Sequence, residues 1–204
     1  LNASTISNAN DVLDGGAGND TLYAYGGDDI LIGGTGNDTL YGGKGNDTYV
    51  FAKGHGQDYV CDSDGKSDTI QFLDVNFDEV KFRKNGNTLI IYGYNEGDSI
   101  EVRDFFYAGD KYAIENFVFK DKTVTLEQLR TEGMVLYGTA GNDSISISVG
   151  KGIMHGGEGD DALNASTISN ANDVLDGGAG NDTLYAYGGD DILIGGTGND
   201  TLYG

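Results

Sequence analysis

The chain has 204 residues, among them 35 glycines and no proline, and carries a formal charge of -21. This charge excludes nucleic acid and anionic lipid surfaces as partners, because both are negatively charged themselves. Glycine is also too frequent for an ordinary packed domain, since each glycine loses more backbone freedom on folding than any other residue.

Nine-residue repeats occupy the first part of the chain, residues 1–68. They follow the pattern Gly-Gly-x-Gly-x-Asp-x-U-x, in which U is a large apolar residue. The aspartates of the sixth position are Asp11, Asp20, Asp29, Asp38 and Asp47, followed after a two-residue insertion by Asp58. A period this short predicts stacked coils, each with a glycine turn and a short strand. Turns on the same side lie two repeats apart, so we expect Asp20 to face Asp38 and Asp29 to face Asp47.

The turns have the chemistry of a calcium site. Glycine at positions 1, 2 and 4 permits positive φ and close approach of backbones. Carboxylates and the carbonyl oxygens freed in such turns are hard ligands, which suit the 6–8 oxygen coordination of Ca²⁺ better than the tight octahedron of Mg²⁺. A zinc site is not expected, because His55 and His155 occupy variable positions and Cys61 has no partner cysteine. The predicted ligand positions of this arm are Asp11, Gly16, Gly18, Asp20, Gly27, Asp29, Gly34, Gly36, Asp38, Gly43, Gly45, Asp47, Gly54, Gly56 and Asp58.

An acidic stretch, "DSDGKSD", joins this arm to the next segment. Asp62 and Asp68 are predicted to close the last calcium site, and the alternative is a solvated acidic loop.

Residues 69–133 differ in character, since they carry only -4 of the total charge. Apolar and polar residues alternate here, which predicts strands near 69–72, 79–83, 88–94, 99–106 and 114–119. Asn85-Gly86 predicts a hairpin turn. Thr125, with Gln128 three residues later, predicts a short helix near 125–132 that Gly133 ends. We interpret this segment as a capping module that continues the sheet of the first arm. Its aromatic residues Phe105, Phe106, Tyr107 and Tyr112 are expected in the core or, alternatively, on a ligand-binding surface.

The repeats return in residues 134–204. The predicted ligand positions are Gly141, Asp143, Gly157, Gly159, Asp161, Asp173, Gly178, Gly180, Asp182, Gly189, Asp191, Gly196, Gly198 and Asp200. Gly152 stands where an aspartate is expected, so we expect that turn to bind metal weakly or not at all. Residues 163–204 are identical to residues 1–42. This identity indicates a recent duplication or deliberate engineering, and a tandem array of 162-residue units would explain it.

The repeats "GGAGNDTLY", "GGTGNDTLY", "GGKGNDTYV" and "GGEGDDALN" resemble the RTX (repeats-in-toxin) haemolysin-type calcium-binding nonapeptide. The middle segment looks like the haemolysin-type calcium-binding-related domain. The resemblance implies a mainly β fold, a right-handed parallel β-roll in two arms, with several Ca²⁺ ions, bacterial type I secretion and folding driven by extracellular calcium. Gly152 and the pair Ala24-Tyr25, which replaces the first two glycines of its turn, depart from the family pattern.

We therefore expect a calcium-binding tandem repeat module of a large secreted bacterial exoprotein, located outside the cell and without catalytic residues. Its expected partners are calcium, the type I secretion machinery and neighbouring repeats, with no nucleic acid and no membrane insertion. No signal peptide is recognised, and because the sequence begins inside a repeat we expect Leu1 not to be a natural start. The alternatives are an adhesin stalk or ligand-binding repeat, and an accessory module of a secreted enzyme or toxin.

Overall fold

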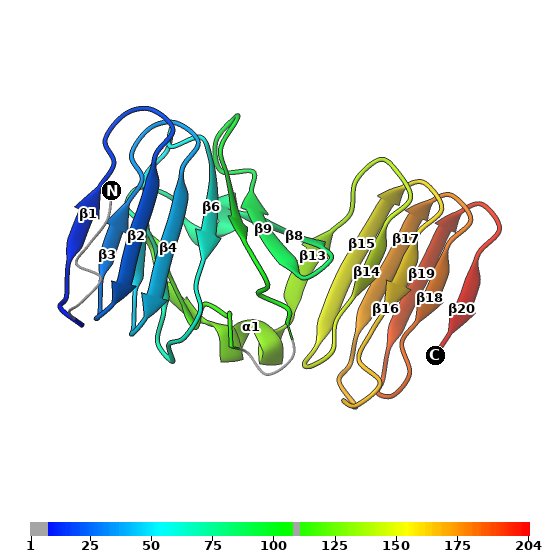
Figure 1. Ribbon diagram of the computed structural model, residues 1–204. Coiled ribbons are helices and arrows are strands. Elements are labelled where there is room, and N and C mark those ends of the chain that lie inside the picture. The colour runs from blue at the N-terminus through cyan, green and yellow to red at the C-terminus, as the bar shows by residue number, and fades with distance from the viewer. Residues whose placement is uncertain (1–7, 108–110) are drawn as a thin grey trace. The chain divides into compact units, whose positions relative to one another are not determined.

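The computed structural model describes residues 8–107 and 111–204, so residues 1–7 of the expected first roll lie outside it. The described chain is mainly β and forms two compact units. The first contains the described residues up to 81 and from 85 to 126, and the second contains residues 82–84 and 127–204. Within each unit, successive coils stack side by side with their strands in parallel (Figure 1). The predicted parallel β-roll class is thus confirmed.

The first unit places its coils in two sheets. One sheet has the order β1-β3-β5-β7-β11-β12, and the other contains the run β2-β4-β6-β10-β9. The strands are β1 (Val12–Asp14), β2 (Thr21–Gly26), β3 (Ile30–Ile32), β4 (Thr39–Lys44), β5 (Thr48–Phe51), β6 (Gln57–Cys61), β7 (Thr69–Phe72), β9 (Thr88–Tyr92), β10 (Ser99–Val102), β11 (Asn116–Val118) and β12 (Thr123–Thr125).

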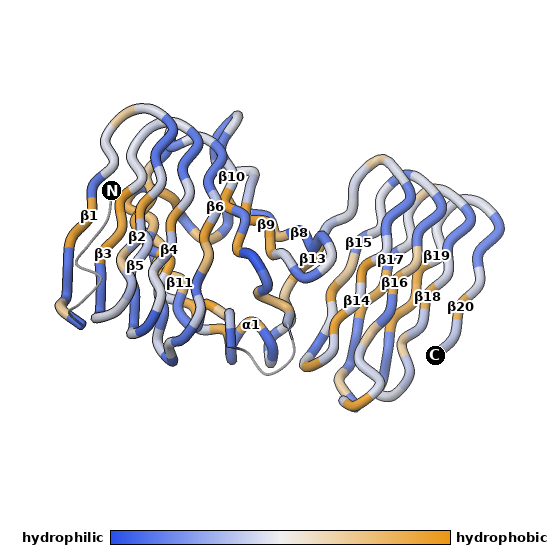
Figure 2. The backbone as a smooth tube through the Cα atoms, in the orientation of Figure 1, coloured by the Kyte–Doolittle hydropathy of each residue, from blue (hydrophilic) through white to orange (hydrophobic). Residues whose placement is uncertain are grey.

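The eighth position of each repeat builds the core between the sheets. Leu22 of β2 lies opposite Leu40 of β4, and both side chains are fully buried. Leu31 and Tyr49 form the matching pair of β3 and β5 and are also fully buried. Figure 2 shows the hydrophobic residues along the strands and the hydrophilic ones in the turns. Alternate residues of a strand face opposite sides, so one apolar residue per short strand is enough to fill this narrow core.

Strands of the middle segment continue the first roll, as predicted, and the structure shows that they extend both of its sheets. β7 pairs in parallel with β5, and β11 pairs in parallel with β7. On the other sheet, β10 pairs in parallel with β6 and antiparallel with β9. The predicted strand at 114–119 is shorter in the structure, and the following β12 was not predicted. A short 3₁₀ helix, Phe77–Glu79, precedes β8 (Lys81–Asn85), and Gly86 adopts a φ of +58° in the turn after β8.

The second unit repeats the two-sheet arrangement. One sheet contains the run β13-β15-β17-β19, and the other has the order β14-β16-β18-β20. Its strands are β13 (Met134–Tyr137), β14 (Ser144–Ser146), β15 (Gly152–Glu158), β16 (Ala162–Asn164), β17 (Val174–Ala179), β18 (Thr183–Tyr185), β19 (Ile192–Thr197) and β20 (Thr201–Tyr203). Leu136 of β13 also lies opposite Phe82 of β8 in a parallel pair.

The predicted short helix is present as α1 (Leu126–Glu132). It begins directly after Thr125, and Gly133 ends it with a φ of +106° and an N–H donated to the carbonyl of Leu129. A positive φ at this place is the usual reason for a glycine at a helix C-terminus. Among the aromatic residues of the middle segment, Phe105 is buried, whereas the Tyr107 side chain is 52% exposed.

Candidate metal sites

The aspartates of the sixth position form a ladder along each side of the roll. The backbone N–H of Asp20 donates to Oδ1 of Asp38 at 2.8 Å, and that of Asp29 donates to Oδ1 of Asp47 at 2.9 Å. The second unit has the same contact, from Asp161 to Oδ1 of Asp182 at 2.8 Å. The predicted pairing of Asp20 with Asp38 and of Asp29 with Asp47 is therefore confirmed. In these pairs the backbone uses Oδ1 of Asp38, Asp47 and Asp182, and Oδ2 of the same carboxylates remains available.

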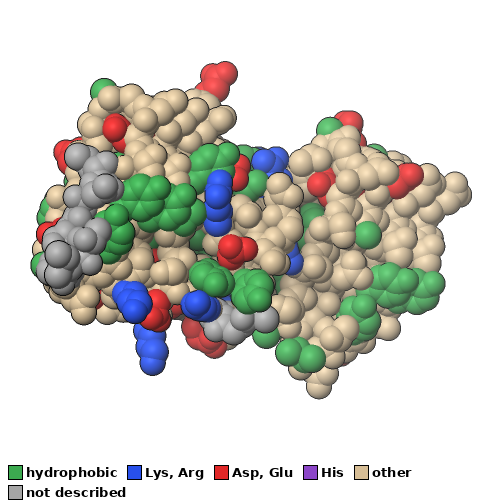
Figure 3. All heavy atoms as spheres, in the orientation of Figure 1, with side chains coloured by type: hydrophobic (Ala, Val, Ile, Leu, Met, Phe, Trp, Pro, Cys, Tyr) green, Lys and Arg blue, Asp and Glu red, His purple; other side chains and the backbone are tan. Residues whose placement is uncertain are grey.

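The second carboxylate oxygens are buried without a protein partner. Within the described part of the chain, eight buried Oδ2 atoms accept no hydrogen bond, and they belong to Asp11, Asp29, Asp38, Asp47, Asp62, Asp161, Asp173 and Asp182. An unpaired buried carboxylate is costly unless it is protonated or bound to a cation. Burial accordingly raises the pKa of Asp29, Asp38, Asp161 and Asp173. Acidic side chains are scattered on the face seen in Figure 3, where hydrophobic and other atoms dominate.

Where the first position of a turn is glycine, backbone and carboxylate oxygens approach it closely. A Cβ atom at Gly15 would lie 2.5 Å from the carbonyl oxygen of Gly33 and 3.1 Å from Oδ2 of Asp20. A Cβ atom at Gly156 would lie 2.5 Å from the carbonyl oxygen of Gly177 and closer still to Oδ2 of Asp161. A carbonyl oxygen of a neighbouring turn and a carboxylate oxygen therefore lie close beside each of these two glycines, and a Cβ atom would clash with both.

The first-position glycines were not among the predicted site residues, which were drawn from positions 2, 4 and 6. They are Gly15, Gly33, Gly42, Gly138, Gly156, Gly177 and Gly195. The pattern itself contains the signal, because these glycines recur at one position. The expected reason was incomplete, since none of them has a positive φ and their role is close approach.

Positions 2 and 4 are glycines for the predicted conformational reason. Gly34 and Gly36 have φ values of +99° and +128°, in the region that residues with a Cβ atom avoid. Gly141 is an exception among the predicted positions, because its φ is not positive. Tyr25 and Tyr187 occupy the second position of their turns and adopt a φ of +71°, so these turns hold a bulky residue in the left-handed region.

The fifth position contributes a second ladder that sequence reasoning missed. Oδ1 of Asn19 accepts the backbone N–H of Asn37 at 2.9 Å, and Oδ1 of Asp28 accepts that of Asn46 at 2.8 Å. The side chain here holds the next coil on the same side, whereas the sixth-position side chain holds the preceding one. This explains why Asn and Asp, which have an oxygen at the right distance, fill the fifth position.

Three aspartates come together where the first arm meets the middle segment. Ligand atoms of Asp47, Asp62 and Asp68 lie within 4.8 Å of one another, and all three residues are buried. The Tyr49 hydroxyl donates to Oδ1 of Asp62 at 2.8 Å and accepts the N–H of Gly42 at 3.2 Å. This grouping brings together the two residues predicted to close the last site, Asp62 and Asp68.

The electrostatics of this cluster favour a cation. Burial raises the pKa of Asp47 to about 7. Burial also raises the pKa of Asp62 and of Asp68, and the neighbouring Asp62 charge adds to the effect on Asp68. Three buried carboxylates repel one another and lose hydration, so they take up protons unless a cation compensates their charge. The donor set is made of hard oxygens, which fits Ca²⁺.

Three turns differ from this pattern. In the turn that ends at Asp143, Oδ2 accepts the backbone N–H of Thr139 at 2.6 Å and its hydroxyl at 2.8 Å. In the turn at Gly152, the backbone N–H donates to Oδ1 of Asp173 at 2.6 Å, but Gly152 brings no carboxylate. In the turn that ends at Asp58, Oδ2 is not free, because it lies 2.6 Å from Nδ1 of His55.

Among the described residues no helix is long and apolar enough to cross a membrane.

The fold and the repeated oxygen sites define a calcium-binding β-roll. The sequence matches the RTX calcium-binding nonapeptide repeat at residues 6–40, 23–57, 135–146 and 168–202. It matches the haemolysin-type calcium binding protein related domain at residues 89–124. The chain is therefore built of RTX haemolysin-type calcium-binding repeats, with a related haemolysin-type domain between them.

Comparison with curated proteins found no significant match. Among solved structures, the chain is similar to the extracellular lipase LipA from Serratia marcescens, with 21% sequence identity and a TM-score of 0.35. The match covers 92% of this chain but only 28% of the lipase.

Proposed function

We propose that this chain is a calcium-binding tandem repeat module of a secreted bacterial exoprotein, and that its rolls fold when they meet extracellular calcium after type I secretion. The observation that carries the proposal is the set of eight buried Oδ2 atoms without a protein partner. Seven of them recur at the sixth position of the repeat, and the eighth belongs to Asp62 of the acidic stretch, so a single ligand type explains them all. In this proposal the module binds calcium and catalyses no reaction.

The sixth-position aspartates and the glycine turns would hold the ions, and calcium would supply the positive charge that the buried carboxylates lack. We assign the Asp47, Asp62 and Asp68 cluster to such a site, positioned by the Tyr49 hydroxyl. Without calcium, carboxylate repulsion and the conformational entropy of glycine favour the unfolded chain. That state suits passage through a secretion channel.

Binding would supply the free energy of folding, since an ion that binds only the folded state stabilises it. Extracellular modules bind calcium with Kd on the order of 10⁻⁴–10⁻³ M, which is above the calcium level inside cells and near that outside. In this proposal residues 1–68 and 134–204 are the rolls, and residues 69–133 are the capping module.

The test is far-UV circular dichroism during a calcium titration that starts in chelator, with magnesium as the control. A cooperative gain of β signal with calcium and not with magnesium is expected. A chain that is fully folded in chelator, or that folds equally well with magnesium, would refute the proposal.

A further inference from the structure

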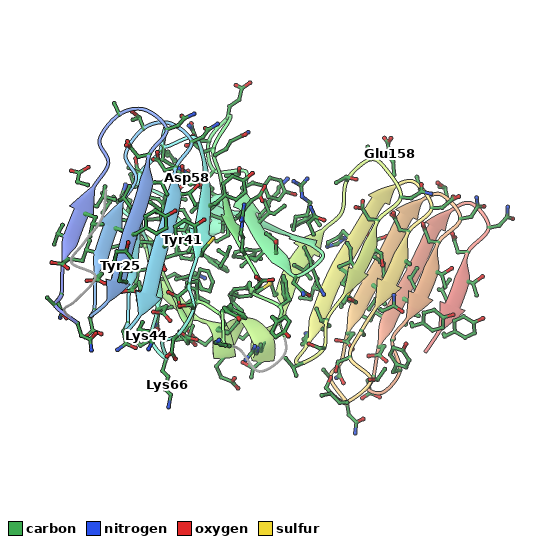
Figure 4. The ribbon with its side chains drawn as sticks, viewed as in Figure 1. Tyr25, Tyr41, Lys44, Asp58, Lys66 and Glu158 are labelled. Carbon is green, nitrogen blue, oxygen red and sulfur yellow. The ribbon has the colours of Figure 1, made fainter. Side chains whose placement is uncertain are left out.

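His55 is placed differently from other residues at the same position of the turn. The third position is exposed at Thr35, Lys44 and Glu158, whereas the His55 side chain is only 3% exposed. Figure 4 shows Glu158 pointing away from its coil, as a third-position side chain normally does. His55 instead turns inward, toward the carboxylate of its own turn.

The ring of His55 contacts Oδ2 of Asp58, the carboxylate oxygen that has no protein partner in the neighbouring turns of Asp38 and Asp47. Its Nδ1 lies 2.6 Å from Oδ2 of Asp58, and its Nε2 lies 2.6 Å from the hydroxyl of Tyr94. Oδ1 of Asp58 accepts the backbone N–H of Asp38 at 2.7 Å. Both oxygens of this buried carboxylate therefore have protein partners, unlike those of Asp38 and Asp47.

The middle segment completes this arrangement. Tyr94 lies between β9 and β10 and is only 6% exposed, and its ring stacks on that of His55 with centroids 5.8 Å apart. Asp98 accepts the backbone N–H of Gly54 at 2.6 Å and that of Gly56 at 3.0 Å. Side chains from the first arm and from the middle segment thus close this turn. Hydrogen bonds satisfy both carboxylate oxygens of Asp58.

We propose that His55 takes the place of a calcium ion in this turn, so that the coil of β6 is complete without metal and holds the middle segment to the roll. This inference deepens the proposed function, because it separates one metal-independent turn from the calcium-dependent ones. Asp58, which the repeat pattern predicts as a calcium ligand, is then a partner of His55. In a solenoid each coil contacts only its neighbours, so a preformed coil provides the surface on which the others assemble.

Hydrogen exchange of single amides on the full chain tests this inference. Ser99 N–H donates to the carbonyl of Gly56 at 2.9 Å, and Arg103 N–H donates to that of Val60 at 3.0 Å, so both report on the β6 coil. Ile30 N–H donates to the carbonyl of Asp11, and Thr39 N–H donates to that of Asp20. Both amides report on coils next to a carboxylate whose Oδ2 has no protein partner, that of Asp29 or that of Asp38. In chelator, Ser99 and Arg103 are expected to exchange at least about tenfold more slowly than Ile30 and Thr39.

The variants H55A and K44A form a matched pair, because both truncate a third-position side chain. H55A is expected to abolish the protection of Ser99 and Arg103 in chelator, while K44A leaves it unchanged. If H55A does not fold even with calcium, Y94F replaces it, since this change removes only the hydroxyl that meets Nε2; it is expected to reduce the same protection.

The outcomes separate this inference from the proposed function. Fast exchange of Ser99 and Arg103 in wild-type chain with chelator would overturn the role of His55, and so would protection that survives in H55A or, where that variant does not fold, in Y94F. Slow exchange of Ile30 and Thr39 in chelator would instead overturn calcium-driven folding, whatever happens at Ser99 and Arg103.

Discussion

The space beside the first glycine of a turn allows a sharp test of the calcium sites. In G156A, the new Cβ atom would lie 2.5 Å from the carbonyl oxygen of Gly177 and even closer to Oδ2 of Asp161. The substitution changes no charge and demands no positive φ, because Gly156 does not have one. It therefore forces apart two oxygens of the proposed ion site, the carbonyl of Gly177 and Oδ2 of Asp161, without changing the charge.

Forcing a methyl group into such a space typically costs about 1–3 kcal/mol. Each 1.4 kcal/mol corresponds to about a tenfold change in an equilibrium constant, so the dissociation constant of the ion held by this turn is expected to rise by about 5- to 150-fold. The calcium midpoint of the second unit is expected to rise by a smaller factor, because several ions bind together. The measurement is a calcium titration followed by circular dichroism, with isothermal calorimetry to count the bound ions.

The matched control is G141A in the same unit. A Cβ atom at Gly141 would meet only Oγ1 of Thr139, at 3.8 Å, and its φ is not positive either. G141A is therefore expected to keep the wild-type midpoint. Equal midpoints for G156A and wild type, or equal shifts for both variants, would contradict an ion site formed by the carbonyl of Gly177 and Oδ2 of Asp161.

Three further predictions concern the first unit. D38N removes a charge from a buried ladder position and is expected to raise the calcium midpoint. D14N removes the same charge from an exposed position and is expected to leave the midpoint unchanged. Equal effects of the two variants would point to net charge alone. In chelator, lower pH is expected to favour the folded first unit, because the pKa of Asp47 is about 7 in the folded state against an ordinary 3.8. The stabilisation is therefore present at acid pH and lost as pH rises from about 4 to 7. Circular dichroism in chelator at pH 5 and pH 8 checks the sign, and greater structure at pH 8 would contradict it. Y49F removes the hydroxyl that donates to Asp62 and is expected to destabilise the calcium-bound unit by about 0.5–2 kcal/mol. Urea denaturation measures this loss, and an unchanged urea midpoint would show that the hydroxyl does not support the site.

The nine-residue period determined most of the fold. The apolar eighth position recurs with the repeat and supplies the buried core residues Leu22, Leu31 and Leu40, and the sixth position predicted which aspartates face one another. These predictions succeed because a solenoid makes position in the repeat equivalent to position in space. The strands of the middle segment were also predictable from alternation, although their ends were not, since strand ends depend on the neighbouring strand.

Other features could not be predicted from the repeat alone. His55 sits at a position that is exposed at Thr35, Lys44 and Glu158, and its inward placement depends on Tyr94, which lies 39 residues away along the chain. The grouping of Asp62 with Asp47 and Asp68 likewise depends on how the acidic stretch returns to the roll. Long-range contacts decide both cases, and a local pattern does not contain them.

The duplicated segment separates the two levels most directly. Leu40 and Leu202 have identical surroundings in sequence over the preceding residues, yet Leu40 is fully buried and Leu202 is 42% exposed. The sequence by itself determined that both side chains point into the roll, because both residues occupy the eighth position of a repeat. Tertiary structure decided the burial, because β4 has a neighbouring strand on each edge, β2 and β6, whereas within the described chain β20 pairs only with β18. In a roll each coil is buried by its neighbours, so the same residues gain hydrophobic stabilisation only where the next coil is present.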